Sequence, residues 1–92
     1  MKIAKHLRIE GRVQGVSFRY EMEAKAKQLG LTGWVRNRYD ESVEAVVCGN
    51  MREIDEIVAW AKHGPRLANV TRLQVLEAED PRSDNFVILP TK

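Results

Sequence analysis

The chain has 92 residues, of which 43% are hydrophobic and 30% are charged, and its formal net charge at pH 7 is +2. These values predict one globular domain, residues 1–92, and exclude a disordered chain. The slight positive charge suits a small anionic ligand, but it is too weak to indicate nucleic-acid binding.

The first two predicted elements are a strand and a helix. Residues 3–10 (IAKHLRIE) alternate apolar and polar side chains, which predicts a strand with one wet face. Apolar residues then recur at helical spacing as Phe18, Met22, Ala26 and Leu29. Gly30 is expected to end this helix, and Ser17 is the predicted N-cap, with its hydroxyl accepting from an amide of the first turn.

Four more segments read as strands or turns. Residues 31–38 and 42–49 predict two strands joined by a turn at 39–41. Residues 69–80 and 85–90 predict the last two strands, separated by turn-forming Asp-Pro and Ser-Asp pairs.

The second helix has the clearest pattern. Asn50 followed by Glu53 resembles a capping box, and Gly64–Pro65 is expected to end the helix. The apolar stripe between these signals comprises Met51, Ile54, Ile57, Val58 and Ala61.

The element order is therefore β-α-β-β-α-β with a short extra strand at the end. Two helices need a common surface to cover, so this order predicts an antiparallel sheet with both helices on one face. This architecture is the α+β, ferredoxin-like split β-α-β sandwich. Many unrelated functions occur on it, so the fold alone does not decide the function.

The segment GRVQGVSFRY, residues 11–20, connects the first strand to the first helix. A helix start exposes unpaired amides and the positive end of the helix dipole, and Gly11 and Gly15 let the backbone turn amides inward. Arg19 adds a full charge and a fork that can bond two phosphate oxygens. The segment thus fits a phosphate cradle, although its spacing alone fits a tight turn followed by a solvated arginine equally well.

Residues 11–19 (GRVQGVSFR), 30–37 (GLTGWVRN) and 42–49 (SVEAVVCG) together closely resemble the acylphosphatase family. The resemblance runs from the first predicted strand to the last. It implies a hydrolase that splits small-molecule acyl phosphates into a carboxylate and inorganic phosphate, with no metal and no cofactor.

The resemblance also implies roles for particular residues. Arg19 matches the phosphate-binding arginine of the family, and Asn37 matches the asparagine that positions the attacking water. The backbone matching the phosphate cradle is that of Gln14, Gly15, Val16, Ser17 and Phe18. Without the resemblance, Asn37 would be interpreted as a turn former.

The implied chemistry makes few demands on the protein. A carboxylate is a good leaving group, so the main requirements are positioning and stabilisation of charge on the phosphoryl oxygens. No side chain is an obvious general base, and for the family a substrate phosphate oxygen has been proposed to take the proton of water.

Three positions depart from the family pattern. Ser17 stands where glycine or a bulky apolar residue is common, and we expect the cradle to survive because serine keeps its amide. Glu41 follows Asp40 where glycine is usual, and glutamate resists a positive φ, so the turn should change type or carry strain. Arg66 replaces a frequent proline, with no predicted effect.

Other residues are interpreted as structural. Arg36 and Arg38 are expected to be solvated or to provide mild electrostatic steering. Trp34 and Trp60 are expected to pack, and Cys48 to be a buried or half-buried hydrophobe.

Two rival classes lack their required residues. An RNA-binding module of this order needs exposed aromatics on its central strands, and residues 42–49 have none. A metal-carrying domain needs paired cysteines, and His6 and His63 form no ligand set. A catalytically silent regulatory domain that binds an anion in the same cradle is the remaining alternative, and the presence of both Arg19 and Asn37 argues against it.

The sequence also predicts the setting of the protein. A single cysteine excludes an internal disulfide, and no apolar run has the length of a signal peptide or a membrane span. No apolar surface stretch calls for a partner. We therefore expect a cytoplasmic monomer that binds neither nucleic acid nor membrane.

Overall fold

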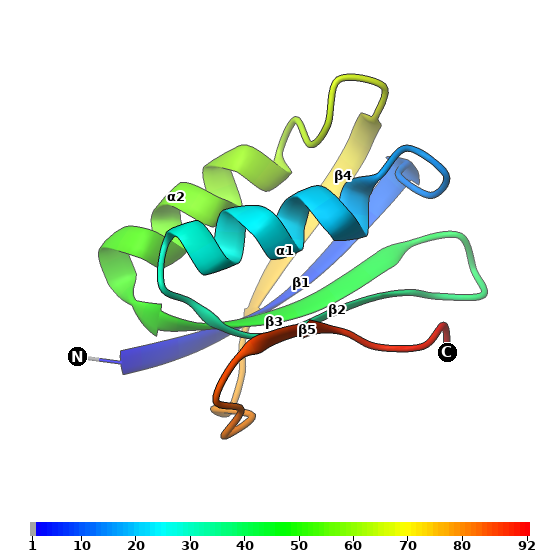
Figure 1. Cartoon of the computed structure of the whole chain (residues 1–92). Helices are drawn as coiled ribbons and strands as arrows, with labels where there is room; N and C mark the ends of the chain where they lie inside the picture. Colours follow the sequence, from blue (N-terminus) through cyan, green and yellow to red (C-terminus); the bar gives the residue numbers. More distant parts are fainter. Residues whose placement is uncertain (1) are drawn as a thin grey trace.

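The computed structural model describes residues 2–92. Its elements in chain order are β1 (Lys2–Arg12), α1 (Phe18–Gln28), β2 (Thr32–Asn37), β3 (Val43–Asn50), α2 (Met51–Ala61), β4 (Asn69–Glu77) and β5 (Phe86–Ile88). The sheet has the strand order β4-β1-β3-β2-β5, and both helices lie on the same face of it (Figure 1). α1 contacts β2 and β5, whereas α2 contacts β1 and β3. The predicted ferredoxin-like α+β fold is confirmed.

The prediction of an antiparallel sheet is wrong at one edge. Three strand pairs are antiparallel, but β5 pairs with β2 in parallel, with Val35 opposite Ile88. β4 and β5 lie at opposite edges of the sheet, so the segment between them crosses the sheet instead of forming a hairpin (Figure 1). Alternation of side chains indicates that β5 is a strand, but it does not specify which strand pairs with β5 or in which direction.

The hydrophobic core fills the space between the sheet and the helices. Leu7 and Ile9 of β1 are completely buried, as predicted for the apolar face of that strand. The Phe18 ring of α1 lies 5.2 Å from the ring of Trp60 on α2, so Trp60 packs between the helices as expected. Cys48 is also buried, and burial raises the pKa of its thiol above the ordinary value, which keeps it protonated and unreactive.

Neither predicted side-chain cap is formed. Ser17 is the N-cap of α1, but its backbone is left-handed, with φ 67°, and its side chain makes no capping bond. A serine cap needs extended backbone to point its hydroxyl at the first turn, so the left-handed conformation explains the difference. Asn50 is the N-cap of α2 and is exposed, with no capping bond from its side chain. Here β3 runs directly into the helix.

The β2–β3 turn carries the expected strain. Glu41 adopts φ 74°, in the left-handed region that glycine favours. Two hydrogen bonds to Asp40 Oδ1, from the Ser42 amide at 3.0 Å and the Ser42 hydroxyl at 2.6 Å, hold the turn. These bonds hold the pKa of Asp40 below its usual value. The hydrogen bonds between Ser42 and Asp40 therefore hold Glu41 in a backbone conformation that glycine usually adopts.

Candidate active site

Strand pairing brings the cradle segment and the end of β2 to the same end of the sheet. Val43 of β3 lies opposite Ile9 of β1 on one side and opposite Asn37 of β2 on the other. Beyond Ile9, β1 continues to Arg12, and the chain then crosses to the start of α1. The first turn of α1 and the last residue of β2 are therefore neighbours in space, although they are far apart in sequence.

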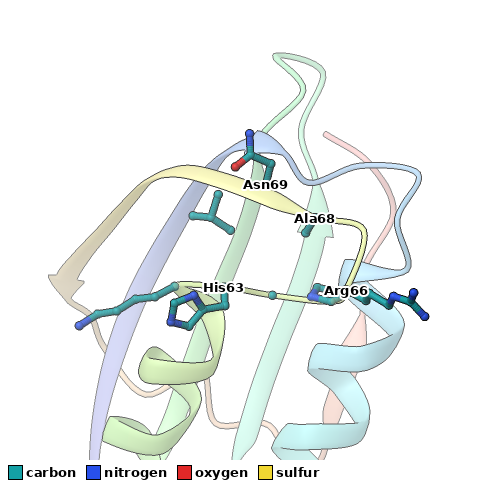
Figure 2. A pocket seen from close by; sticks show the side chains of 8 residues that line it. His63, Arg66, Ala68 and Asn69 are labelled. Atoms are coloured by element: carbon teal, nitrogen blue, oxygen red, sulfur yellow. The ribbon is translucent and has the colours of Figure 1, made fainter.

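One cavity of the structure lies away from this place. It has a volume of about 340 Å³ and lies beyond the end of α2, between residues 62–66 and 68–70. The side chains of His63 and Arg66 extend in opposite directions along it (Figure 2). It holds neither Arg19 nor Asn37, and its lining side chains do not converge on a common point. Arg66 thus belongs to this larger cavity.

A second cavity, of about 210 Å³, lies between the cradle segment and β2. Its lining residues are Val13, Gly15, Ser17, Phe18, Arg19, Tyr20 and Asn37. The structure therefore brings five of the seven predicted site residues to one cavity. The other two, Gln14 and Val16, lie outside it: Val16 is buried in the core, and the side chain of Gln14 points to the β2–β3 turn.

The cradle backbone alternates into the left-handed region. Gly15 has φ 73° and Ser17 has φ 67°. Such alternation turns successive amides toward one side of the chain, which produces an anion-binding concavity. The Ser17 carbonyl accepts from the Glu21 amide at 3.0 Å, so the helix begins at once after the concavity. The left-handed φ of Ser17 is a conformation that glycine adopts more readily than serine.

Gly11 has a different role from the predicted one. It lies inside β1, opposite Val70 of β4, at a register shift in the strand pairing. Its φ is 121°, and an added Cβ would lie only 2.2 Å from the carbonyl oxygen of Asn69. Gly11 therefore permits a close approach of two strands and does not shape the cradle.

Arg19 is half-buried in the first turn of α1. Its Cζ atom lies 5.7 Å from the centroid of the Tyr20 ring, within the range of a cation–π contact. Within residues 2–92, no ion pair joins Arg19 to a carboxylate. Its charge is thus not neutralised inside the described fold, and the guanidinium lines a cavity at a helix start, where the dipole adds positive potential.

Asn37 lines the cavity and is held in place by its backbone. Its carbonyl accepts from the Lys92 amide at 3.1 Å, and its residue pairs with Val43. Its Oδ1 atom is buried and has no hydrogen-bond partner among residues 2–92. A buried acceptor without a partner is costly, so this oxygen is suited to accept a hydrogen from a molecule in the cavity.

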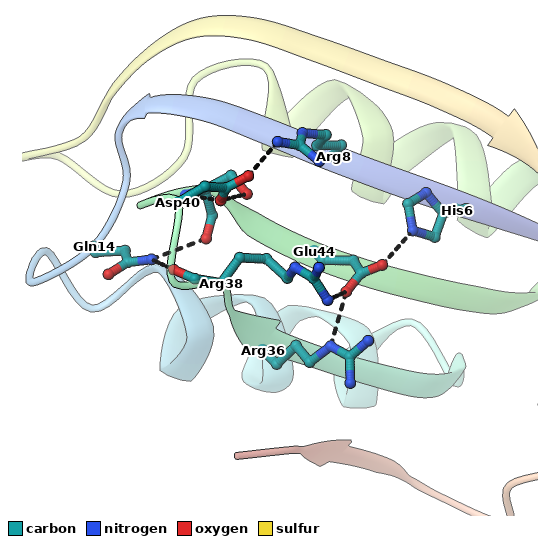
Figure 3. Close-up of polar contacts among 8 residues, drawn as sticks. His6, Arg8, Gln14, Arg36, Arg38, Asp40 and Glu44 are labelled. Atoms are coloured by element: carbon teal, nitrogen blue, oxygen red, sulfur yellow. Dashed lines mark hydrogen bonds and ion pairs between the residues drawn. The ribbon is translucent and has the colours of Figure 1, made fainter. Parts of the chain in front are cut away.

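The arginines flanking Asn37 are not solvated as predicted. Both bind Glu44 on the face of the sheet that the helices leave open. Arg36 Nε lies 2.8 Å and Arg38 Nη1 3.3 Å from the Glu44 Oε1 atom (Figure 3). His6 Nε2 lies 2.7 Å from the other carboxylate oxygen. Arg36 also lies over the Trp34 ring, 4.6 Å from its centroid. Alternation places these side chains correctly on the open face, but it does not show that two arginines and a histidine share one acid.

This cluster sets the pKa of Glu44. Burial acts to raise the pKa, but the hydrogen bonds from His6 and Arg36 and the charges of Arg36 and Arg38 outweigh burial and lower it below the usual value of 4.5. A carboxyl whose pKa is lowered by folding stabilises the fold above its unfolded pKa, and that contribution is lost as the pH falls through the folded pKa.

We expect Glu44→Gln to lower the free energy of unfolding at pH 7 by about 2 kcal/mol, because charge-assisted hydrogen bonds are lost. The difference from the parent should begin to shrink as the pH falls past 4.5 and should be smallest below the lower pKa of the folded protein, where the parent carboxyl is protonated. Urea unfolding at the two pH values measures this, with the exposed Glu56 of α2 changed to Gln as a control. Equal destabilisation at both pH values would contradict the account.

Sequence reasoning missed Val13 and Tyr20 as lining residues and missed the contacts of the Gln14 side chain. Tyr20 is 64% exposed, so no burial pattern marks it. Among residues 2–92, no group of three His, Cys, Asp or Glu side chains could hold a metal ion, and no helix is long and apolar enough to cross a membrane.

The fold and the cavity define a small ferredoxin-like domain with a cavity between the strand-to-helix loop and the end of β2. The acylphosphatase family model matches residues 5–88. An acylphosphatase from Azoarcus sp. is 49% identical over 88 residues, which cover 96% of this chain and 90% of the relative. The chain belongs to the acylphosphatase family. These likenesses confirm the predicted family and support a hydrolase of that class.

Solved structures agree with this assignment. The acylphosphatase from Coxiella burnetii superposes with a TM-score of 0.92 at 34% identity, covering 96% of this chain and 93% of that one. Full-length HypF, solved in a phosphate- and nucleotide-bound form, also matches with a TM-score of 0.92 at 28% identity. That match covers 99% of this chain but 12% of HypF, so the same unit also occurs as a part of a larger protein.

Proposed function

We propose that this chain hydrolyses small acyl phosphates to a carboxylate and inorganic phosphate, and that the 210 Å³ cavity is its active site. Membership of the acylphosphatase family supports the reaction. The observation that carries the choice of site is that Arg19 and Asn37 line the same cavity from two different elements. The larger cavity is also lined by an arginine and an asparagine, Arg66 and Asn69, but their side chains point in different directions (Figure 2).

Phosphate binding is assigned to Arg19 and to the amides of the cradle. The guanidinium fork bonds two phosphoryl oxygens, and the left-handed residues Gly15 and Ser17 direct amides at the same group. The start of α1 adds the positive end of its dipole. These donors stabilise the charge that the phosphoryl oxygens carry in the transition state.

Asn37 is assigned to the attacking water. Its unpartnered Oδ1 accepts one hydrogen of the water, which leaves an oxygen lone pair free to point at phosphorus. The water oxygen forms the new bond to phosphorus, the bond from phosphorus to the acyl oxygen breaks, and the carboxylate leaves with its electron pair. The proton of the water passes to a phosphoryl oxygen, so no protein base is consumed.

The proposal includes metal independence and a cytoplasmic, monomeric protein acting as one domain. Arg19 and the backbone amides supply the positive charge that a metal ion supplies in many phosphoryl-transfer sites. The lining of the cavity offers neutral groups and one cation, which suits an anionic substrate better than a metal ion. The proposed setting is supported by the single cysteine, which cannot form an internal disulfide.

The alternative is a domain that binds an anion without turning it over. The match to a small part of HypF supports keeping it in view, because it places the same unit in a larger protein. Turnover distinguishes the two functions: a binding domain would show saturable phosphate binding and no hydrolysis.

We expect the purified protein to hydrolyse benzoyl phosphate with the same kcat/KM in excess EDTA as without it. Loss of benzoyl phosphate can be followed by its ultraviolet absorbance and phosphate release by a colorimetric assay. Saturable phosphate binding with no hydrolysis would favour the silent domain. Loss of activity in EDTA, restored by a divalent metal, would contradict the metal-independent mechanism.

A further inference from the structure

The side chain of Gln14 joins the cradle to the β2–β3 turn. Its Nε2 atom donates to the Arg38 carbonyl at 2.8 Å and to the Ser42 carbonyl at 2.9 Å (Figure 3). These two carbonyls lie on opposite arms of the turn, which is closed by the Arg38 amide donating to Ser42 at 2.8 Å. One side-chain amide thus bonds both arms of the turn at its base.

Gln14 itself lies outside the cavity, but it stands in the chain between two residues of the cavity wall. Its neighbours Val13 and Gly15 both line the cavity. A primary amide nitrogen has two hydrogens, and here both are used on the turn. Any shift of the turn relative to the cradle therefore stretches two hydrogen bonds that are half-buried.

The β2–β3 turn needs such support because it follows Asn37 directly and contains a residue in a strained conformation. Asn37 is the last residue of β2 and directly precedes Arg38. A shift of the Arg38 carbonyl therefore moves the backbone at the end of β2. The turn includes Glu41 in a left-handed conformation, which other backbone shapes would relax. The Oδ1 atom of Asn37 has no partner in the described fold, so its aim depends on the backbone beneath it.

We propose that Gln14 is a positioning residue that acts through Asn37, fixing the distance and angle between the water-orienting amide and the phosphate cradle. This inference rests on the proposed function. The main-chain amides of the cradle do not require the Gln14 side chain, so phosphate binding should be less sensitive to its loss than the chemical step. Misplacement of a reacting group by about 1 Å can cost 10²-fold in rate.

The test replaces Gln14 by Met, which keeps the length of the side chain and removes both donors. We expect kcat for benzoyl phosphate to fall by about 10- to 100-fold, with KM changed much less. In an Asn37→Ala background, Gln14→Met should cause little further loss, because both changes act on the same step. Gln28→Met, at an exposed position of α1, is the matched control and should match the parent.

A second variant and two further measurements separate the positioning role from a loss of folding and from a loss of turnover. Gln14→Asn retains the amide but is one methylene too short, and should show the same split between kcat and KM. Urea unfolding establishes that each variant is folded. In ¹H–¹⁵N NMR spectra, Gln14→Met should shift the side-chain amide of Asn37 and the backbone amides of residues 38–42, and Gln28→Met should leave them unchanged.

The outcomes separate the two proposals. A parent that turns over substrate, together with folded Gln14 variants of unchanged kcat and unchanged Asn37 signals, overturns the positioning role alone. A rise in KM at constant kcat, or full additivity with Asn37→Ala, also overturns it. A parent without turnover contradicts the proposed function, and the Asn37 signals then decide by themselves whether Gln14 positions that residue.

Discussion

Changing Arg19 to alanine is expected to lower kcat/KM for benzoyl phosphate by about 10³-fold or more, because the only full positive charge lining the cavity is removed. We expect kcat to fall and KM to rise, since the guanidinium contacts the phosphoryl oxygens in the ground state and more strongly in the transition state. Initial rates of hydrolysis over a range of substrate concentrations measure the effect.

Two companion variants make this result specific. Arg52 is the second residue of α2, as Arg19 is the second residue of α1, and it is exposed at the other helix start, so Arg52→Ala should keep the parent activity. Arg19→Lys keeps a point charge but loses the bidentate fork, and should recover a small part of the activity. A folded Arg19→Ala variant within tenfold of the parent would remove the basis for the proposed site.

The second large effect is expected at Asn37. Asn37→Ala should lower kcat by about 10²- to 10³-fold, the usual cost of removing one group that hydrogen-bonds a reacting atom, and should change KM little. The reason is that Oδ1 orients the water while Arg19 and the cradle hold the phosphate. Stopped or continuous assays at saturating benzoyl phosphate measure kcat directly.

Asn50 provides the matched control for Asn37. Each is the last residue of its strand, and the Asn50 side chain makes no capping bond, so Asn50→Ala should be active and close to the parent in stability. Asn37→Asp should be inactive as well, because a carboxylate would repel the phosphate dianion. If Asn37→Ala hydrolyses benzoyl phosphate at the parent rate, the assigned role of the water-orienting amide is wrong.

Much of the fold follows from periodicity and end signals. Alternation in β1 predicts the burial of Leu7 and Ile9, and the stripe of α2 predicts the burial of Ile54 and Ile57. The parallel pairing of β5 was not predictable in this way, because it depends on how the chain crosses the sheet. The Ser17 cap failed for a local reason, its left-handed backbone, whereas Asn50 has the extended backbone of an N-cap and nothing in the structure explains its missing capping bond.

The site could be predicted only in part. Residue types and the family likeness point to Arg19 and Asn37, which line one cavity in the structure, while their roles stay predictions. The contacts of Gln14 could not be read from sequence, since they depend on the distance between the cradle and a turn 24 to 28 residues away. The sharing of Glu44 by His6, Arg36 and Arg38 likewise depends on strand register.

The convergence of Arg19 and Asn37 on one phosphate is tested most directly by titrating the protein with inorganic phosphate and following its ¹H–¹⁵N NMR signals. The backbone amides of residues 15–19, the Nε–H of Arg19 and the side-chain amide of Asn37 should shift together along one saturation curve. Shifts confined to residues 62–70, around the larger cavity, or an Asn37 signal that stays fixed while Arg19 saturates, would contradict it.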